Sequence, residues 1–188
     1  MSLLKVAKLG NPILRQIAQP IDLESLSPSN GEIQILIDNM IDTMREEDGV
    51  GLSAPQVFHS LQLVVIECSS NDRYPEVPEI PLTVLVNPVI KHYGEEKALG
   101  WEGCLSLNDL RGLVPRSKKI TIEYFDRESK PITVDAEGFP AVVFQHEIDH
   151  LHGKVFLDRM TDLSQLAYVE ELEGYIANKE TVESELAE

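Results

Sequence analysis

The chain has 188 residues, 43% of them hydrophobic, and a formal net charge of −16. This length suits one domain with a buried core, and so negative a surface excludes nucleic acids and anionic membranes as expected direct partners. No apolar run is long enough to span a bilayer, and no signal-peptide core stands near the N-terminus. We therefore expect a cytoplasmic protein whose two cysteines, Cys68 and Cys104, are free thiols.

The first regular element is predicted after a polar loop at residues 22–31. Ser29 or Asn30 would cap a helix that runs from Glu32 to about Glu47, with Gly49 as its stop. Apolar residues recur at helical spacing along this stretch, which predicts an amphipathic helix that faces the core. These residues are Ile33, Leu36, Ile37, Met40, Ile41 and Met44.

The middle of the chain predicts strands. Two short apolar runs, Leu61 to Glu67 and Leu82 to Asn87, have the length and composition of strands. Alternation of apolar and polar residues from Ile120 to Tyr124 predicts a half-buried strand. We expect residues 131–134 to pair with that strand across a turn near residues 126–129.

Two further helices are predicted in the last third. One runs from Phe139 to Gly153 with a proline in its first turn, and another covers about Leu163 to Ala177. Residues 179–188 indicate a frayed acidic tail. We predict an α+β fold, with residues 1–188 forming a single compact domain. Antiparallel or mixed strands would pack around the helix that starts at Phe139, with an amphipathic helix on the N-terminal side and a helix at the C-terminal end.

The most informative motif is H-E-x-x-H, which His146, Glu147 and His150 form within the predicted helix. Histidines four residues apart share one face of a helix, so both imidazoles can bind one metal ion. Glu147 is not needed as a ligand and could take a proton from a metal-bound water. This constellation indicates a metal-dependent hydrolase.

A catalytic metal site needs a third protein ligand besides the two histidines. His152 lies two residues beyond His150 and would point away from the metal face. Cys104 lies upstream in the segment E-G-C-L-S, residues 102–106, and its thiolate is a strong ligand for a borderline or soft cation. Cys68 has no such context, and we expect it in the core.

A third segment, residues 49–56, reads G-V-G-L-S-A-P-Q. Its two glycines and its proline predict a shaped loop and not a strand. The side-chain amide of Gln56 could stabilise a developing oxyanion.

In this order the three segments resemble the motifs of the peptide deformylase family, which are G-x-G-x-A-A-P-Q, E-G-C-L-S and Q-H-E-x-D-H. The second and third motifs match fully, and the first differs only at Ser53, where alanine is usual. Residues 10–15, G-N-P-I-L-R, are similar to the start of family members. The resemblance spans roughly Lys5 to Asp158. Serine is only slightly larger than alanine, so we expect function to survive with Ser53 in this loop.

The resemblance implies a metal site made by Cys104, His146 and His150, with water in the fourth position. The metal would be divalent, with Fe²⁺ favoured and Zn²⁺, Ni²⁺ or Co²⁺ also possible. A thiolate with two imidazoles suits all four ions, so the residues alone do not choose among them.

The resemblance also implies the reaction and its substrate. Glu147 would act as general base and then general acid, while Gln56 and the backbone N–H of Leu105 would hold the oxyanion. The substrates would be N-formyl-methionyl peptides, the ends of nascent chains, and the product would be formate. Gly51 would lie along the path of the substrate, and Val50 would help to take up the methionine side chain. Val143 is another candidate for that apolar pocket.

Two charged groups near the motifs are expected to support them. Glu102 would orient the cysteine loop by pairing with Arg116 or Arg111. Asp149 could hold an imidazole or could equally be a surface or capping residue.

Two other functions remain open. A zinc endopeptidase would take its third ligand downstream and give Cys104 no role, and a catalytically silent metal-binding protein would have a closed four-ligand site. Neither monomer nor homodimer is favoured. Some deformylases dock on ribosomal RNA through a basic C-terminal helix, but residues 161–188 carry eight acidic residues and one lysine. We therefore expect no RNA docking through this segment.

Overall fold

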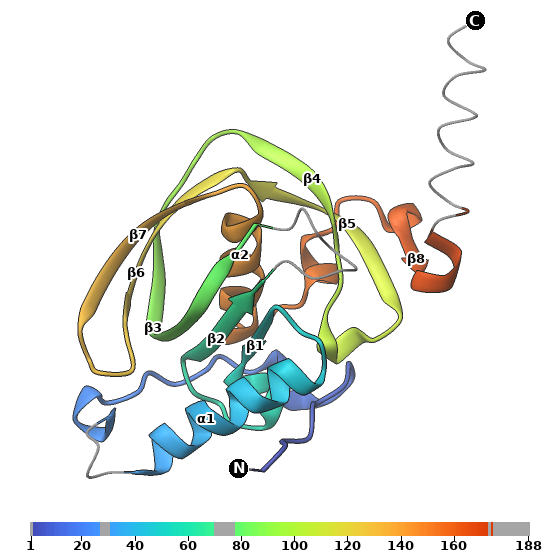
Figure 1. Cartoon of the computed structure of the whole chain (residues 1–188). Helices are drawn as coiled ribbons and strands as arrows, with labels where there is room; N and C mark the ends of the chain where they lie inside the picture. The colour runs from blue at the N-terminus through green and yellow to red at the C-terminus, as the bar shows by residue number, and fades with distance from the viewer. Residues whose placement is uncertain (1, 27–30, 70–77, 173, 175–188) are drawn as a thin grey trace, which may run out of the picture.

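The computed structural model describes residues 2–26, 31–69, 78–172 and 174 (Figure 1). The expected helix cap at Ser29 or Asn30 and the expected acidic tail at residues 179–188 lie outside these ranges. No helix in the described part of the chain is both long enough and apolar enough to cross a membrane.

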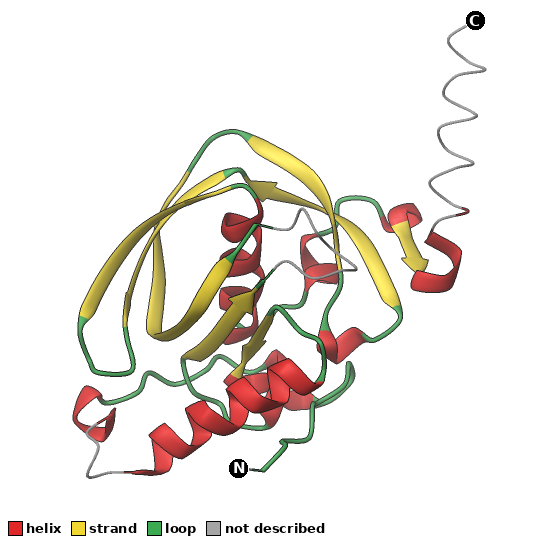
Figure 2. Ribbon diagram, viewed as in Figure 1, coloured by secondary structure: helices red, strands yellow, loops and turns green. Residues whose placement is uncertain are grey.

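The strands form two antiparallel sheets (Figure 2). The larger sheet has the order β1-β2-β3-β6-β7, and the smaller has the order β4-β5-β8. The strands of the larger sheet are β1 Gly51–Ser53, β2 Leu63–Cys68, β3 Ile80–Tyr93, β6 Lys119–Phe125 and β7 Pro131–Glu137. Those of the smaller sheet are β4 Lys97–Glu102, β5 Leu110–Ser117 and β8 Leu166–Tyr168.

Two α-helices pack against these sheets: α1 Gly31–Glu46 and α2 Phe139–Leu151. Figure 1 shows α2 enclosed by strands, whereas α1 lies along the outside near β1 and β2. One apolar cluster joins α2 to β2, β3 and β6, and a second joins α1 to β1, β2 and β3. The prediction of a single α+β domain around the H-E-x-x-H helix is confirmed.

Short 3-10 helices connect these elements. Two of them carry site residues: η3 Ala54–Val57 follows β1, and η4 Leu105–Leu107 follows the cysteine loop. The other four are η1 Pro12–Arg15, η2 Leu23–Leu26, η5 Phe156–Arg159 and η6 Leu163–Gln165. The loop predicted at residues 22–31 therefore contains one helical turn, η2.

Helix α1 begins and ends one residue before the predicted bounds. Its stop differs from the prediction because Asp48, and not Gly49, has the left-handed backbone with φ 51°. The Gly49 N–H donates to the Met44 carbonyl at 2.9 Å and so satisfies a carbonyl at the helix end. Gly49 is needed for space, since a Cβ there would lie 2.8 Å from Leu105 Cδ1.

Strand β3 is much longer than the predicted Leu82–Asn87 run because it changes partner along its length. Its first half pairs with β2 and its second half pairs with β6. Asn87 marks the change: it has φ 50°, and the register shifts between Val86 and Val89. Such a bulge bends a strand, which lets β3 join the two halves of the larger sheet.

Two predictions of local structure are wrong. Residues Gly51–Ser53 form β1 and not a loop, because they pair with Val64–Ile66 of β2 and bury Leu52 completely. The predicted helix at Leu163–Ala177 is interrupted by β8, whose residues pair with Leu110–Gly112 of β5. A 3-10 turn, η6, precedes β8, and α-helical structure begins only at residue 169. Pairing with β5 overrides the helical spacing, which is a weaker local signal.

Candidate metal centre

Helix α2 and the loop after β4 bring three candidate ligands together. Cys104, His146 and His150 each offer a ligand atom, and these atoms all lie within 4.8 Å of one another. Cys104 Sγ is 3.3 Å from His150 Nε2. Among the described residues this is the one group of three or more histidines, cysteines or carboxylates arranged to hold a metal ion.

Helix α2 is buried along most of its length, so its polar residues are enclosed together with its apolar ones. Pro140 stands in its first turn, and Gly138 precedes it with φ 67°. His146 retains 9% of its surface exposed and His150 only 1%. The two histidines are therefore carried by a buried helix, an element that holds side chains in fixed positions.

The electrostatics favour a thiolate at Cys104. Burial raises the pKa of this thiol, but the charges of His150 and His146 and hydrogen bonds from both outweigh it, so its pKa lies well below the ordinary value. For His146, burial lowers the pKa, while hydrogen bonds with Cys104 and Glu102 raise it well above the ordinary value. A thiolate is the form of cysteine that binds metals.

The donor set fits a divalent metal. One thiolate and two imidazoles are ligands of Zn²⁺, Fe²⁺, Co²⁺ and Ni²⁺, and three protein ligands leave a position open for chemistry. His146 Nδ1 is 2.8 Å from Glu102 Oε2, which leaves its other ring nitrogen free to be a ligand. A closed four-ligand site would need one more such donor within the cluster.

Glu147 is buried beside the cluster. Its side chain lies so close to Gly51 that a Cβ on that glycine would come within 2.5 Å of Glu147 Oε1. Burial raises the pKa of this carboxyl, and the nearby histidines only partly oppose the change. Its Oε2 atom is buried without a hydrogen-bond partner among the described residues.

Gln56 is held in one orientation by Ser53. The amide N–H of Ser53 donates to Gln56 Oε1 at 2.9 Å, and the Ser53 hydroxyl lies 2.8 Å from the same oxygen. A backbone N–H can only donate, so the side-chain oxygen must face it and the NH₂ group must face the other way. That NH₂ group is 3.2 Å from Ser106 Oγ and 3.5 Å from Cys104 Sγ. Ser53, the residue that differs from the family motif, is fully buried and hydrogen-bonded to Gln56.

The remaining expected site residues lie nearby. Leu105 follows Cys104 as the first residue of η4, and Gly51 is the first residue of β1. Val50 is half-buried and packs against the apolar cluster to which Val143 belongs. His152, which we expected to point away from the metal, is exposed, and its Nδ1 is 2.9 Å from the Ile148 carbonyl.

A buried chain of charges supports His146. Arg116 donates to both oxygens of Glu102, at 2.7 and 3.0 Å, and to Asp149 at 2.6 Å. The pairing of Glu102 with Arg116 is thus confirmed, and Asp149 is a buried member of the network and not a surface residue. Arg159 also donates to both oxygens of Asp149, at 2.9 Å from its Nε. Arg159 could not be predicted from local sequence, because it lies ten residues beyond Asp149 and outside the helix.

Opposite charges fix the ionisation of this network. Burial raises the pKa of Glu102, but hydrogen bonds from His146 and Arg116 outweigh it and leave that pKa below the ordinary value. Burial also raises the pKa of Asp149, but hydrogen bonds from Arg159 and Arg116 outweigh this effect and leave that pKa below the ordinary value. Arg111, the alternative partner for Glu102, instead lies against Gly103, where a Cβ would come within 2.5 Å of its guanidinium.

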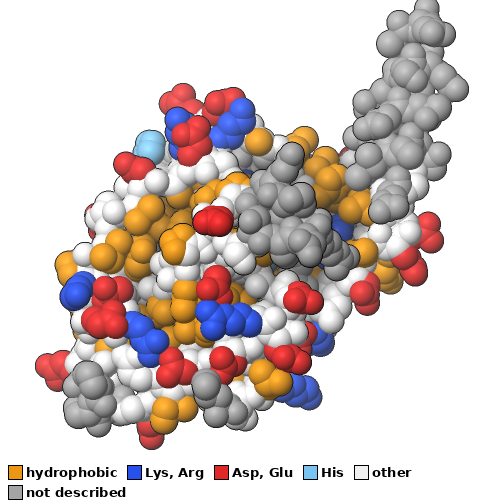
Figure 3. All heavy atoms as spheres, in the orientation of Figure 1, with side chains coloured by type: hydrophobic (Ala, Val, Ile, Leu, Met, Phe, Trp, Pro, Cys, Tyr) orange, Lys and Arg blue, Asp and Glu red, His pale blue; other side chains and the backbone are white. Residues whose placement is uncertain are grey.

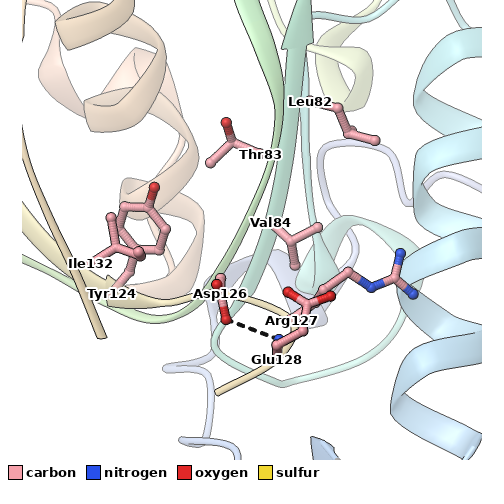
Figure 4. Close-up of a pocket in the computed structure, with 8 residues that line it drawn as sticks. All are labelled: Leu82, Thr83, Val84, Tyr124, Asp126, Arg127, Glu128 and Ile132. Carbon is pink, nitrogen blue, oxygen red and sulfur yellow. Dashed lines mark hydrogen bonds between the residues drawn. The ribbon is translucent and has the colours of Figure 1, made fainter. Parts of the chain in front are cut away.

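A surface hollow lies elsewhere, between the start of β3 and the β6–β7 hairpin (Figure 4). Its turn is fixed by the Glu128 N–H, which donates to Asp126 Oδ1 at 2.9 Å. None of the expected site residues lines it. It is lined by Leu82, Thr83, Val84, Tyr124, Asp126, Arg127, Glu128 and Ile132.

The arrangement on α2, with a thiolate from a neighbouring loop, defines a metal-dependent hydrolase of the H-E-x-x-H type. The family profile described as polypeptide deformylase matches residues 3–166. The chain therefore belongs to the polypeptide deformylase family, enzymes that remove the N-formyl group from newly made polypeptides during protein biosynthesis.

Individual relatives agree with this assignment. The chain is 44% identical to peptide deformylase 1 of Bordetella pertussis over 167 residues, covering 89% of this chain and 93% of that protein. It is equally identical to peptide deformylase 2 of Pseudomonas putida, with the same coverage. Among solved structures, the class I type b peptide deformylase of Acinetobacter baumannii superposes with a TM-score of 0.80 at 39% identity, over 85% of this chain and 100% of that one. The peptide deformylase of Thermotoga maritima superposes with a TM-score of 0.75 at 31% identity, over 86% of this chain and 100% of that one.

Proposed function

We propose that this chain hydrolyses the formyl amide of N-formyl-methionyl peptides and releases formate, with the residues around Cys104 as its active site. The observation that carries the proposal is the position of Cys104, which lies 3.3 Å from a histidine of the H-E-x-x-H motif. An endopeptidase would have no use for this thiolate, so its placement favours the deformylase reaction over internal cleavage of peptides.

Cys104, His146 and His150 would hold one divalent metal, and we propose Fe²⁺ as the physiological ion. When bound, it would supply Lewis-acid chemistry, which lowers the pKa of water to about 7. Glu102 would fix the orientation of the His146 ring through the 2.8 Å contact with its Nδ1. Arg116 would in turn keep Glu102 ionised.

Glu147 would be the general base and then the general acid. It would take a proton from the attacking water and pass it to the departing amine nitrogen. Its buried position and raised pKa suit a group that must hold a proton during part of the cycle. Its unpartnered Oε2 atom is available for that proton.

Gln56 and Leu105 would stabilise the charge that develops on the formyl oxygen. Ser53 fixes the Gln56 amide so that its NH₂ group is directed toward the cysteine loop. The backbone N–H of Leu105 would provide the second donor. Donors that are fixed before the reaction lose little energy to reorganisation, and one such donor is worth about 10²- to 10³-fold in kcat.

The peptide would bind along Gly51 and place its methionine side chain near Val50. Strand β1 is at the edge of the larger sheet, so backbone groups of Gly51 can pair with an extended peptide. The A. baumannii enzyme, similar in fold, has been solved with Met-Ala-Ser bound, which supports a short N-terminal peptide as the ligand. A formyl carbon carries only hydrogen, so an enclosed site can admit it and exclude larger acyl groups.

The test is formate release from a formyl-Met tripeptide by protein purified without oxygen and loaded with Fe²⁺. We expect rapid release that is lost in air, and loss of both metal and activity in Cys104→Ala. The matched control is Cys68→Ala, because Cys68 lies on β2 and is not part of the metal cluster. Cleavage of internal peptide bonds, or full metal content in Cys104→Ala, would refute the proposal.

The proposed place of action is the cytoplasm, where formylated chains are made. Charged side chains of both signs are scattered over the face seen in Figure 3. The net charge of −16 supports the absence of direct RNA binding. This part of the proposal would be contradicted if the protein bound ribosomes and deletion of residues 161–188 abolished that binding.

A further inference from the structure

The N-terminal segment at residues 7–9 joins the two segments that carry the proposed oxyanion donors. The Ala7 N–H donates to the Gln56 carbonyl at 2.7 Å, and the Leu9 N–H donates to the Ser106 carbonyl at 2.9 Å. Ala7 is 1% exposed, so this contact is in the interior. One short segment is therefore hydrogen-bonded to both η3 and η4.

Lys8, between these two residues, contacts Leu105, the residue that carries the second proposed donor. Its Nζ donates to the Leu105 carbonyl at 2.8 Å and to Asn108 Oδ1 at 3.2 Å. The half-buried Leu105 side chain packs against Gly49, where a Cβ would come within 2.8 Å of Leu105 Cδ1. Leu105 is thus held by its carbonyl and, separately, by its side chain.

We propose that Lys8 is a positioning residue for the deformylation reaction. Its ammonium group holds the Leu105 carbonyl, which restricts rotation about the φ and ψ bonds of Leu105 and so positions the Leu105 N–H in the preceding peptide plane. An oxyanion donor is effective only when it lies about 2.7–3.1 Å from the charged oxygen, so small rotations of the backbone are costly. A charged donor holds a carbonyl more firmly than water or a neutral group does. This inference rests on the proposed function.

The experiment compares Lys8→Met and Lys8→Arg with Lys5→Met as the matched control. Lys5 is exposed two residues before this segment, and no side-chain hydrogen bond or ion pair of Lys5 is found within the described residues. We expect kcat of the Lys8→Met enzyme to fall about 5- to 20-fold, less than the 10²- to 10³-fold loss that follows removal of a donor. KM should change less than about twofold, because the donor acts mainly on the transition state. Lys8→Arg should restore kcat, and Lys5→Met should match the wild type.

A spectroscopic measurement separates positioning from general stability. In ¹⁵N-labelled, zinc-loaded protein, the Leu105 amide signal should shift and exchange its hydrogen faster in Lys8→Met. It should be close to the wild-type signal in Lys8→Arg and Lys5→Met, and all variants should have the same Tm. Unchanged kcat in Lys8→Met, a loss that Lys8→Arg does not restore, or an unmoved Leu105 signal would each overturn the inference. Failure of the wild type to release formate would instead refute the proposed function.

Discussion

Removal of Arg116 should destabilise the protein strongly, because this guanidinium lies between two buried carboxylates. Its side chain is 5% exposed, and those of Glu102 and Asp149 are 5% and 7% exposed. Arg116→Met keeps most of the volume but leaves both carboxylates without their shared partner. Removing one member of a buried ion pair costs about 3–5 kcal/mol, so we expect a loss of at least this size from the free energy of unfolding.

The sign of the pH dependence gives this prediction a second check. In the wild type the pKa values of Glu102 and Asp149 are lowered on folding, so their stabilisation is fully present above their unfolded pKa values of about 4. It is lost as the pH falls through the lower folded values. In Arg116→Met, burial is opposed by fewer charges, and the pKa of Glu102 should rise. The cost of the substitution should therefore be larger at pH 7 than at pH 4.

The assay is urea unfolding of chelator-treated protein, which removes metal affinity from the comparison. Lys118→Met is the control, because Lys118 forms an ion pair with Glu96 at the surface, with side chains 42% and 73% exposed. Exposed pairs contribute about 0–1 kcal/mol, so the control should be nearly neutral. A loss below about 1 kcal/mol in Arg116→Met, or a loss that does not change with pH, would refute the reasoning about buried charge.

Three substitutions near the metal site should separate the proposed roles. Gln56→Ala removes a proposed oxyanion donor and should lower kcat about 10²- to 10³-fold with little change in KM, measured by formate release. Gly51→Ala places a Cβ within 2.5 Å of Glu147 Oε1, so activity should fall while metal content, measured by atomic absorption, stays full. Ser53→Ala removes one of the two hydrogen bonds to Gln56 Oε1 and keeps the other, so kcat should fall less than about tenfold, the equivalent of one hydrogen bond. Equal losses in Ser53→Ala and Gln56→Ala would show that the backbone hydrogen bond alone does not orient the amide.

The cluster of three candidate metal ligands could be predicted because its signals are local or carried by short motifs. His146 and His150 are four residues apart on one helix, and that spacing alone places both rings on one face. Cys104 is predicted as a ligand from the motif around it, since a single cysteine forms no spacing pattern. The structure places all three together because β4 ends next to α2.

The support of the site could be predicted only in part. The sequence predicts Arg116 or Arg111, both on β5, as the partner of Glu102. The register of β4 against β5 decides between them. Successive residues of a strand point to opposite faces of the sheet, so Arg111 and Arg116 lie on different faces of β5. The face that contains Gly112 and Arg116 is the one turned toward Phe156 and Met160. Lys8 and Arg159 could not be predicted, because their contacts join residues 97 and 10 positions apart with no periodic pattern.

The error at β8 has a similar origin. Leu166 and Leu172 fit a helical stripe, but residues 166–168 also fit a strand, and periodicity over so few residues does not discriminate. Pairing with β5 at Leu110 and Gly112 supplies hydrogen bonds that an isolated helical turn would lack. Long-range pairing, which is not encoded in local sequence, decides the structure here.

The buried polar residues of α2 show which group the fold leaves for chemistry. Gln145 donates to the carbonyls of Ser117 and Ala141 at 2.9 Å, and Asp149 binds two arginines. Glu147 and His150 differ, because Glu147 Oε2 and His150 Nδ1 are buried and have no partner among the described residues. His150 is a candidate metal ligand, so Glu147 is the residue whose unpartnered atom has no other explanation. A buried polar group without a hydrogen bond costs about 1–3 kcal/mol, which folding alone would not retain.

Glu147→Gln should therefore make the protein more stable and inactive at once. Burial raises the pKa of Glu147, so the carboxylate destabilises the fold above its unfolded pKa, and that penalty is absent near pH 4. The isosteric amide removes the charge, and we expect a gain of about 1 kcal/mol in the free energy of unfolding at pH 7, with little gain at pH 4. Urea unfolding of chelator-treated protein measures this gain, and formate release should fall about 10²- to 10⁴-fold in the loaded enzyme with metal content unchanged. Glu137→Gln is the control, since this glutamate pairs with Lys119 at the surface with 66% of its side chain exposed. A less stable Glu147→Gln protein would mean that the carboxylate serves the fold and would remove the reason for assigning it the proton transfer.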